Sequence, residues 1–178
     1  MIQQSTFDFL AELKLNNHKE WFDANRPRYK NARENVIQFV DQLMDAISTF
    51  DPSLQGLEPK STLFRINRDV RFSKNKDPYK TNFGASMAKG GRKSHFAGYY
   101  VNFSPTECFL AGGAYQPESD RLKQIRHHVD LHADELRAII EDATFKSYFG
   151  ELRGTELNTA TKGYPKDHPA IDLIRKKG

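Results

Sequence analysis

The chain has 178 residues, a mass of 20.5 kDa and a net charge of +4, which is the size of one ordinary domain able to bury a core. Hydrophobic residues make up 38% and aromatic residues 12% of the sequence, a composition that excludes a disordered chain. No apolar run reaches the roughly 18 residues of a membrane span, the N-terminus does not resemble a secretory signal, and the single cysteine excludes an internal disulfide. We therefore expect a single cytoplasmic domain over residues 1–178, without membrane contact, metal or cofactor.

The first third of the chain has the periodicity of amphipathic helices. Apolar residues at helical spacing predict a short helix over residues 7–14 and a further turn of helix around residues 21–22. Pro27 suits the first turn of a helix. Apolar residues at three- and four-residue spacing then predict a long helix over about residues 28–50.

The sequence then changes to short extended segments rich in Phe, Tyr, Val or Thr and separated by Gly and Pro turns. These segments cover residues 61–67, 82–88, 97–104 and 107–115. Neighbouring strands without intervening helices favour an antiparallel sheet.

Helical periodicity returns near residue 118 and continues to about residue 143, with a bend near Leu131. Aromatic residues at 145–149 indicate a further turn, and a short helix ends the chain. The order of helices, strands and helices predicts an α+β fold, in which a mainly antiparallel sheet of about four or five strands is flanked by N-terminal and C-terminal helices.

The positive charge is concentrated in one part of the sequence. Residues 60–95 hold ten basic side chains and only two acidic ones, a net charge of +8, so the other residues together carry −4. Such a strip concentrates phosphates, acidic substrates or nucleic acid, although many charged stretches are merely solvated.

The most distinctive stretch is residues 64–81, which read FRINRDVRFSKNKDPYKT. Its aspartate can hold one neighbouring guanidinium in a fork of two hydrogen bonds, which leaves at least one arginine oriented but not neutralised. Arginine gives planar two-point donation and lysine gives a point charge, as a phosphate or carboxylate site requires. We predict an anion-binding site whose members are Arg65, Arg68, Asp69, Arg71, Ser73, Lys76, Tyr79 and Lys80.

The same residues allow three functions. The first is recognition of a phosphate-bearing ligand, either a small molecule or nucleic acid. In the second, an enzyme clamps a phosphorylated or carboxylated small molecule with these arginines, and His18 or His168 supplies proton transfer. In the third, the arginines only brace a structural or protein-interaction domain, with Arg68 and Arg71 fully paired with carboxylates or backbone carbonyls. The motif itself holds no His, Glu or Cys, so binding is favoured over catalysis.

Two weaker patterns have structural interpretations. Trp21 and Phe22 suit base stacking, but the apolar stripes around them favour a role in the core. His128 and His132 have the spacing of a metal-binding pair on a helix, yet no companion acidic motif supports a metal site.

Three separated blocks resemble a bacterial and fungal family of conserved hypothetical proteins, a domain of unknown function. The blocks are NNHKEWF at residues 16–22, the pattern FRIxRDxRFSxxKxPYK at residues 64–80, and KGYP with DHP at residues 162–169. The resemblance implies an α+β domain with the arginine-rich stretch as its hallmark and implies no established activity. Members of that family usually continue some tens of residues further, typically with another helix, so it is an open expectation that this chain is a shortened form.

Overall fold

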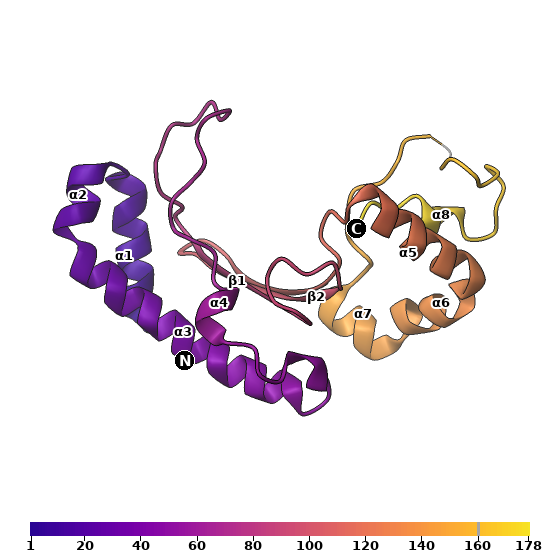
Figure 1. Cartoon of the computed structure of the whole chain (residues 1–178), viewed down its shortest axis with the longest axis horizontal. Helices are drawn as coiled ribbons and strands as arrows, with labels where there is room; N and C mark the ends of the chain where they lie inside the picture. The colour runs from indigo at the N-terminus through magenta and orange to yellow at the C-terminus, as the bar shows by residue number, and fades with distance from the viewer. Residues whose placement is uncertain (160) are drawn as a thin grey trace. The chain divides into compact units, whose positions relative to one another are not determined.

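The computed structural model describes residues 1–159 and 161–178, which form two compact units, residues 1–113 and 114–178 (Figure 1). Its described residues contain eight α-helices and a three-stranded antiparallel sheet, so the predicted α+β class is confirmed. The extent of the domain stays a prediction. No helix in the described ranges has both the length and the apolar character needed to cross a membrane.

Three helices open the first unit, where the sequence periodicity predicts them. They are α1 (Gln4–Leu15), α2 (Lys19–Ala24) and α3 (Arg26–Ser48). Pro27 lies in the first turn of α3, where backbone N–H groups have no partner within the helix, so proline removes no helical hydrogen bond there. The apolar stripe of α3 is buried at Val36, Val40, Met44 and Ile47, which explains why the helix runs through 23 residues without a break.

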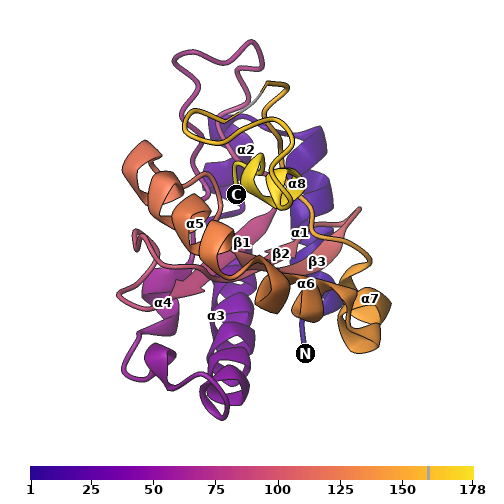
Figure 2. The same ribbon diagram turned by 90° about the vertical axis from the view of Figure 1, so that its right-hand side faces the viewer.

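The sheet consists of β1 (Phe83–Ala88), β2 (Gly98–Phe103) and β3 (Cys108–Gly113) in the order β1-β2-β3. In its register Ala85 lies opposite Val101, and Val101 opposite Leu110. Figures 1 and 2 both show α3 running along one face of this sheet. The side chains of β3 are exposed, whereas β1 is buried at almost every position.

The core of the first unit joins α1 and α3 to the buried face of β1 and β2. Its fully or almost fully buried members include Phe9, Leu10, Leu13, Val36, Val40, Phe83, Ala85, Met87 and Val101. Burying a Leu, Val or Phe side chain contributes about 1.5–3 kcal/mol. This cluster therefore stabilises the first unit and fixes the position of β1.

The expected first strand, residues 61–67, is not a strand, and the sheet has three strands rather than four or five. Residues Pro59–Thr62 form the short helix α4, because proline starts the turn and the Thr62 hydroxyl donates back to the Pro59 carbonyl at 2.7 Å. The residues that follow make single bridges only, Leu63 with Ala85 and Asn67 with Tyr79. Alternation alone does not distinguish such bridges from a continuous ladder.

The second unit contains α5 (Ser119–Leu131), α6 (Ala133–Glu141), α7 (Ala143–Phe149) and α8 (Ile171–Ile174), all labelled in Figure 2. The helix expected from residue 118 to 143 is broken at His132, beside the predicted bend. Among the described residues of this unit, the buried apolar side chains are Ala170, Leu173 and Ile174, around α8. Arg126 of α5 ties α5 to α8 by donating to the Ile174 carbonyl at 2.8 Å.

Candidate functional site

The arginine-rich motif forms a narrow antiparallel pair at the edge of the first unit. The Arg68 N–H donates to the Pro78 carbonyl at 2.8 Å, and the Lys80 N–H donates to the Ile66 carbonyl at 2.8 Å. A third bond, from the Phe64 N–H to the Gly84 carbonyl at 2.9 Å, ties the pair to β1. These bonds hold both ends of a loop over residues 69–77, drawn in Figure 1 as the purple-magenta excursion above β1.

Asn17, between α1 and α2, fixes the return segment of this pair. Its side-chain amide donates to the Tyr79 carbonyl at 3.0 Å and accepts from the Tyr79 N–H at 3.0 Å. The Tyr79 ring is buried and stacks on Phe22 with centroids 4.0 Å apart. Tyr79, a predicted site residue, therefore supports the fold, and the first two blocks of the family resemblance meet here.

Trp21 and Phe22 belong to the core, as their structural interpretation predicts. Phe22 is buried, and the Trp21 ring stacks on Phe9 with centroids 5.9 Å apart. The Phe22 ring therefore provides no open face for a nucleic acid base, and the Trp21 ring packs against the core.

A basic pocket of about 340 Å³ lies beside the motif and is lined by Phe64, Arg65, Lys80, Arg92 and Lys93. The Lys80 Nζ is 5.2 Å from the centroid of the Phe64 ring, and the Arg92 guanidinium carbon is 5.1 Å from it. The negative face of an aromatic ring attracts cations without cancelling their charge. The ring thus gathers two positive charges that remain available to an anion.

The positive charges of the basic pocket repel one another. Burial, and then the charges of Arg65 and Arg92, lower the pKa of Lys80 below its ordinary value. Within the described part of the chain, no carboxylate forms an ion pair with Arg65, Lys80, Arg92 or Lys93. A bound anion would relieve this repulsion.

Arg92 and Lys93 reach the basic pocket from the loop between β1 and β2. Gly90 and Gly91 have φ values of +83° and +91°, which side chains with a Cβ rarely adopt, and they turn the chain sharply. Arg92 is then held by donating from Nη1 to the Leu63 carbonyl at 2.9 Å. Both cations belong to the basic strip of the sequence but were not predicted as members of the anion-binding site. The only sequence signal for the turn that brings them there is the Gly90-Gly91 pair.

Within the loop over residues 69–77, charged side chains bond to other groups of the same loop. Arg71 holds Asp69 in a two-point fork, with Nε 3.0 Å from Oδ1 and Nη2 2.7 Å from Oδ2. These bonds lower the pKa of the Asp69 carboxyl, and the more distant charge of Arg65 lowers it further. The predicted fork is present, and Arg71 is the arginine it neutralises.

The other predicted residues of this loop are also engaged. Arg68 donates to the Asp77 carbonyl at 3.0 Å and to the Ser73 hydroxyl at 3.3 Å, while Lys76 donates to the Val70 carbonyl at 3.1 Å. These contacts brace the loop, as the structural interpretation predicts for Arg68. Of the predicted site residues, Arg65 and Lys80 line the basic pocket.

The two histidines considered for proton transfer serve helix ends. His18 is the N-cap of α2, accepting from the Trp21 N–H at 3.5 Å, and its ring also lies 3.0 Å from Glu20. His168, in the second unit, accepts at Nδ1 from the Ala170 N–H at 3.1 Å, and its Nε2 lies 2.9 Å from Asp130. Because both nitrogens of His168 are occupied, this ring positions the start of α8.

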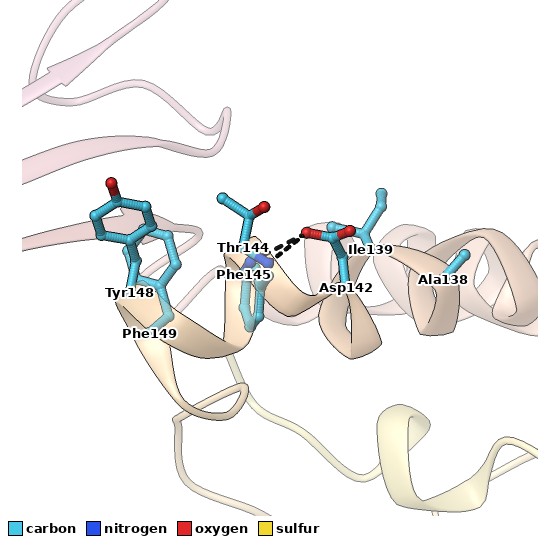
Figure 3. Close-up of a pocket in the computed structure, with 7 residues that line it drawn as sticks. All are labelled: Ala138, Ile139, Asp142, Thr144, Phe145, Tyr148 and Phe149. Carbon is cyan, nitrogen blue, oxygen red and sulfur yellow. Dashed lines mark hydrogen bonds between the residues drawn. The ribbon is translucent and has the colours of Figure 1, made fainter.

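The second unit has an apolar pocket of about 520 Å³ between α6 and α7, lined by Ala138, Ile139, Asp142, Thr144, Phe145, Tyr148 and Phe149 (Figure 3). Its one carboxylate, Asp142, caps α7 by accepting from the N–H groups of Thr144 and Phe145 at 2.8 and 3.3 Å. The pocket therefore offers a ligand few polar groups.

The histidine pair on the helix is not part of a metal site. His132 pairs with Glu135 at 2.9 Å, and the described residues contain no group of three side chains able to hold a metal ion.

Comparison with known proteins gives the family but no activity. Residues 5–178 match the family model described as Conserved hypothetical protein (DUF2461). No curated protein and no solved structure shows significant similarity to the chain. The family match covers nearly the whole sequence, so the chain belongs to the DUF2461 family of conserved hypothetical proteins.

Proposed function

We propose that the protein recognises a phosphate group carried by its ligand, and that the basic pocket is the site. The observation that carries the proposal is that four cations line one pocket, two of them over the neutral Phe64 ring, with no carboxylate of the described residues paired to them. Like charges held together in a partly buried site destabilise the empty protein. An anion stabilises the same arrangement.

The residue types in the basic pocket suit a phosphate group in particular. Arg65 and Arg92 bring planar guanidinium groups that donate to two oxygens at once, and the two lysines bring point charges. Arg92 is already anchored through the Leu63 carbonyl, so little side-chain freedom is lost when it binds. Arg71, the exposed arginine of the loop, does not share this arrangement, because Asp69 neutralises it.

Recognition is favoured over catalysis by the positions of the histidines. An enzyme that clamps its substrate with these arginines needs an acid or base within hydrogen-bond reach of it. His18 caps α2 and the ring of His168 is engaged at both nitrogens, and neither is among the residues that line the basic pocket. Lys80 lines the basic pocket with a pKa that burial and the neighbouring charges lower, and we assign it to electrostatic binding.

Calorimetric titration of the full chain with pyrophosphate at low salt tests this function. Arg65→Ala and Lys80→Met each remove a charge-assisted contact and are expected to weaken binding by about tenfold or more. Arg71→Ala is the matched control, because it removes a cation of the same strip that is already neutralised by Asp69. Equal losses in all three variants, or no binding by the unaltered protein at low salt, would overturn the proposal.

A further inference from the structure

Aromatic rings accompany the cations along the basic strip. Phe64, Phe72 and Phe96 have exposed fractions of 38%, 95% and 52%. The Arg71 guanidinium carbon lies 5.7 Å from the centroid of the Phe72 ring, and the Lys89 Nζ lies 5.5 Å from that of Phe96. Each exposed phenylalanine between residues 60 and 96 thus has a cation over its ring.

Exposed phenylalanines elsewhere in the described chain differ. Phe50, Phe109 and Phe149 have exposed fractions of 69%, 41% and 48%. Among the described contacts the first two pack on a tyrosine and Phe149 packs on Phe145, and none of the three has a cation over its ring. The combination of ring and positive charge is therefore a property of the strip. It is not a general feature of the surface.

The loop that carries Phe72 is held in shape while its ring remains in water. Arg71 is fixed by Asp69, Arg68 bonds to Ser73 and Asp77, and the loop closes on the pairing of Arg68 with Pro78. A large apolar ring that is exposed to solvent does not stabilise the fold. A preformed loop does lower the entropic cost of binding through that ring.

We propose that the phosphate-bearing ligand is single-stranded nucleic acid, with bases stacking on Phe72 and Phe96 and a backbone phosphate in the basic pocket; this inference rests on the proposed function of that pocket. Unpaired bases stack on aromatic side chains while cations follow the backbone, and arginine over the far face of the ring strengthens the stack. A duplex hides the faces of its bases. Insertion into an anionic membrane would draw the cations over each ring into the apolar layer, at a high cost.

Binding is measured by fluorescence anisotropy of the full chain with a labelled oligothymidylate of about 15 nucleotides. Unlabelled single strands of DNA or RNA are expected to compete strongly. An abasic oligonucleotide of the same length is expected to compete roughly tenfold more weakly, because it lacks the stacking faces. Inorganic polyphosphate and duplex DNA are the further competitors.

Point variants measure the contribution of the rings to binding separately from that of the charges. Phe72→Ala is expected to weaken binding by roughly tenfold and to leave the salt dependence unchanged, because it removes stacking alone. Lys93→Ala removes a phosphate contact, so the slope of log affinity against log salt should become shallower by about 0.7. Phe50→Ala and Lys30→Ala are the matched controls, a ring and a cation exposed outside the strip, and both should bind as the unaltered protein does.

The outcomes distinguish this inference from the proposed function. If polyphosphate and the abasic strand compete as well as the single strand, and Phe72→Ala has no effect while Arg65→Ala weakens binding, the nucleic acid inference is wrong and the phosphate pocket stands. If none of these anions binds at low salt, both fall. Phe72-dependent binding to phosphatidylserine vesicles without binding to oligonucleotides would also overturn the inference in favour of a membrane.

Discussion

Lys80 has a charge that opposes folding. Its ammonium is half-buried over the Phe64 ring, and burial together with Arg65 and Arg92 lowers its pKa. A lysine whose pKa is lower in the folded than in the unfolded state binds protons more weakly when folded, so the stability of the protein rises with pH through that range. At neutral pH, below both pKa values, the full destabilisation is present.

Replacing Lys80 with methionine should therefore stabilise the protein while it weakens anion binding. Methionine keeps an apolar stem against Phe64 and removes the charge, so the melting temperature at pH 7 is expected to rise. The gain over the unaltered protein should shrink as the pH approaches about 10, near the ordinary pKa of lysine. Thermal unfolding followed by circular dichroism from pH 7 upward measures this difference, and a lower melting temperature at pH 7 would contradict it.

At the scale of elements, the turn between α1 and α2 acts as a partner for the motif. Asn17 satisfies both backbone groups of Tyr79 with one side-chain amide, in the way a neighbouring strand would. The Tyr79 ring on Phe22 adds an apolar contact between the same two segments. Lys80 follows Tyr79 directly, so this turn also positions one wall of the basic pocket.

Asn17→Ala is expected to lower the free energy of unfolding by about 2 kcal/mol, because it leaves a partly buried donor and acceptor without partners. Asn31→Ala, at an exposed position of α3, provides the control and should change it by less than about 0.5 kcal/mol. Urea denaturation of the three proteins gives the comparison. Similar stabilities for the two variants would show that the Asn17 bonds contribute little.

Two glycines of the sheet allow a matched test of strand packing. A Cβ on Gly98 would press against the Met87 carbonyl and the Ala88 Cβ, whereas one on Gly112 would have its nearest neighbour at 4.0 Å. Gly98→Ala is expected to destabilise the protein by about 1–3 kcal/mol through overpacking, while Gly112→Ala should be close to neutral. Urea midpoints that fall equally in both variants would mean that strand propensity rather than packing controls stability at this end of the sheet.

The elements that follow a single period were predictable and those set by distant contacts were not. The stripe of α3 appears in the sequence as a period of 3.6 residues, and β1, β2 and β3 appear as short segments rich in Phe, Tyr, Val or Thr between turn residues. Residues 61–67 have the same composition, but their partners are one-residue bridges. The motif locates Arg65 and Lys80, while Arg92 joins them through a turn at Gly90-Gly91 that brings separated segments together.

At the scale of the whole molecule, residues 1–113 hold 16 basic and 12 acidic side chains, so they carry the entire net charge of +4. The hydrophobic core cluster and the residues of the basic pocket also lie within this range. The second unit is electrically neutral, with buried apolar residues around α8. The net charge and the residues of the proposed anion site thus both lie in the first unit.

A fragment of residues 1–113 is therefore expected to fold cooperatively and to keep pyrophosphate affinity within about threefold of the full chain, about 0.65 kcal/mol. Urea denaturation and calorimetry of the fragment measure both properties. A fragment that folds but does not bind would place part of the site outside residues 1–113. A fragment that does not fold would show that its core is insufficient.

The bonds from Asn17 to Tyr79 join residues 62 positions apart, and this separation has a consequence for the order of folding. Closing so long a loop is entropically costly, so contacts of this kind tend to form after local helices. We expect the charges of the basic pocket to come together only late, when the core already compensates for their repulsion. Asn17→Ala should then mainly accelerate unfolding and leave the refolding rate almost unchanged, a partition that stopped-flow kinetics in urea resolves.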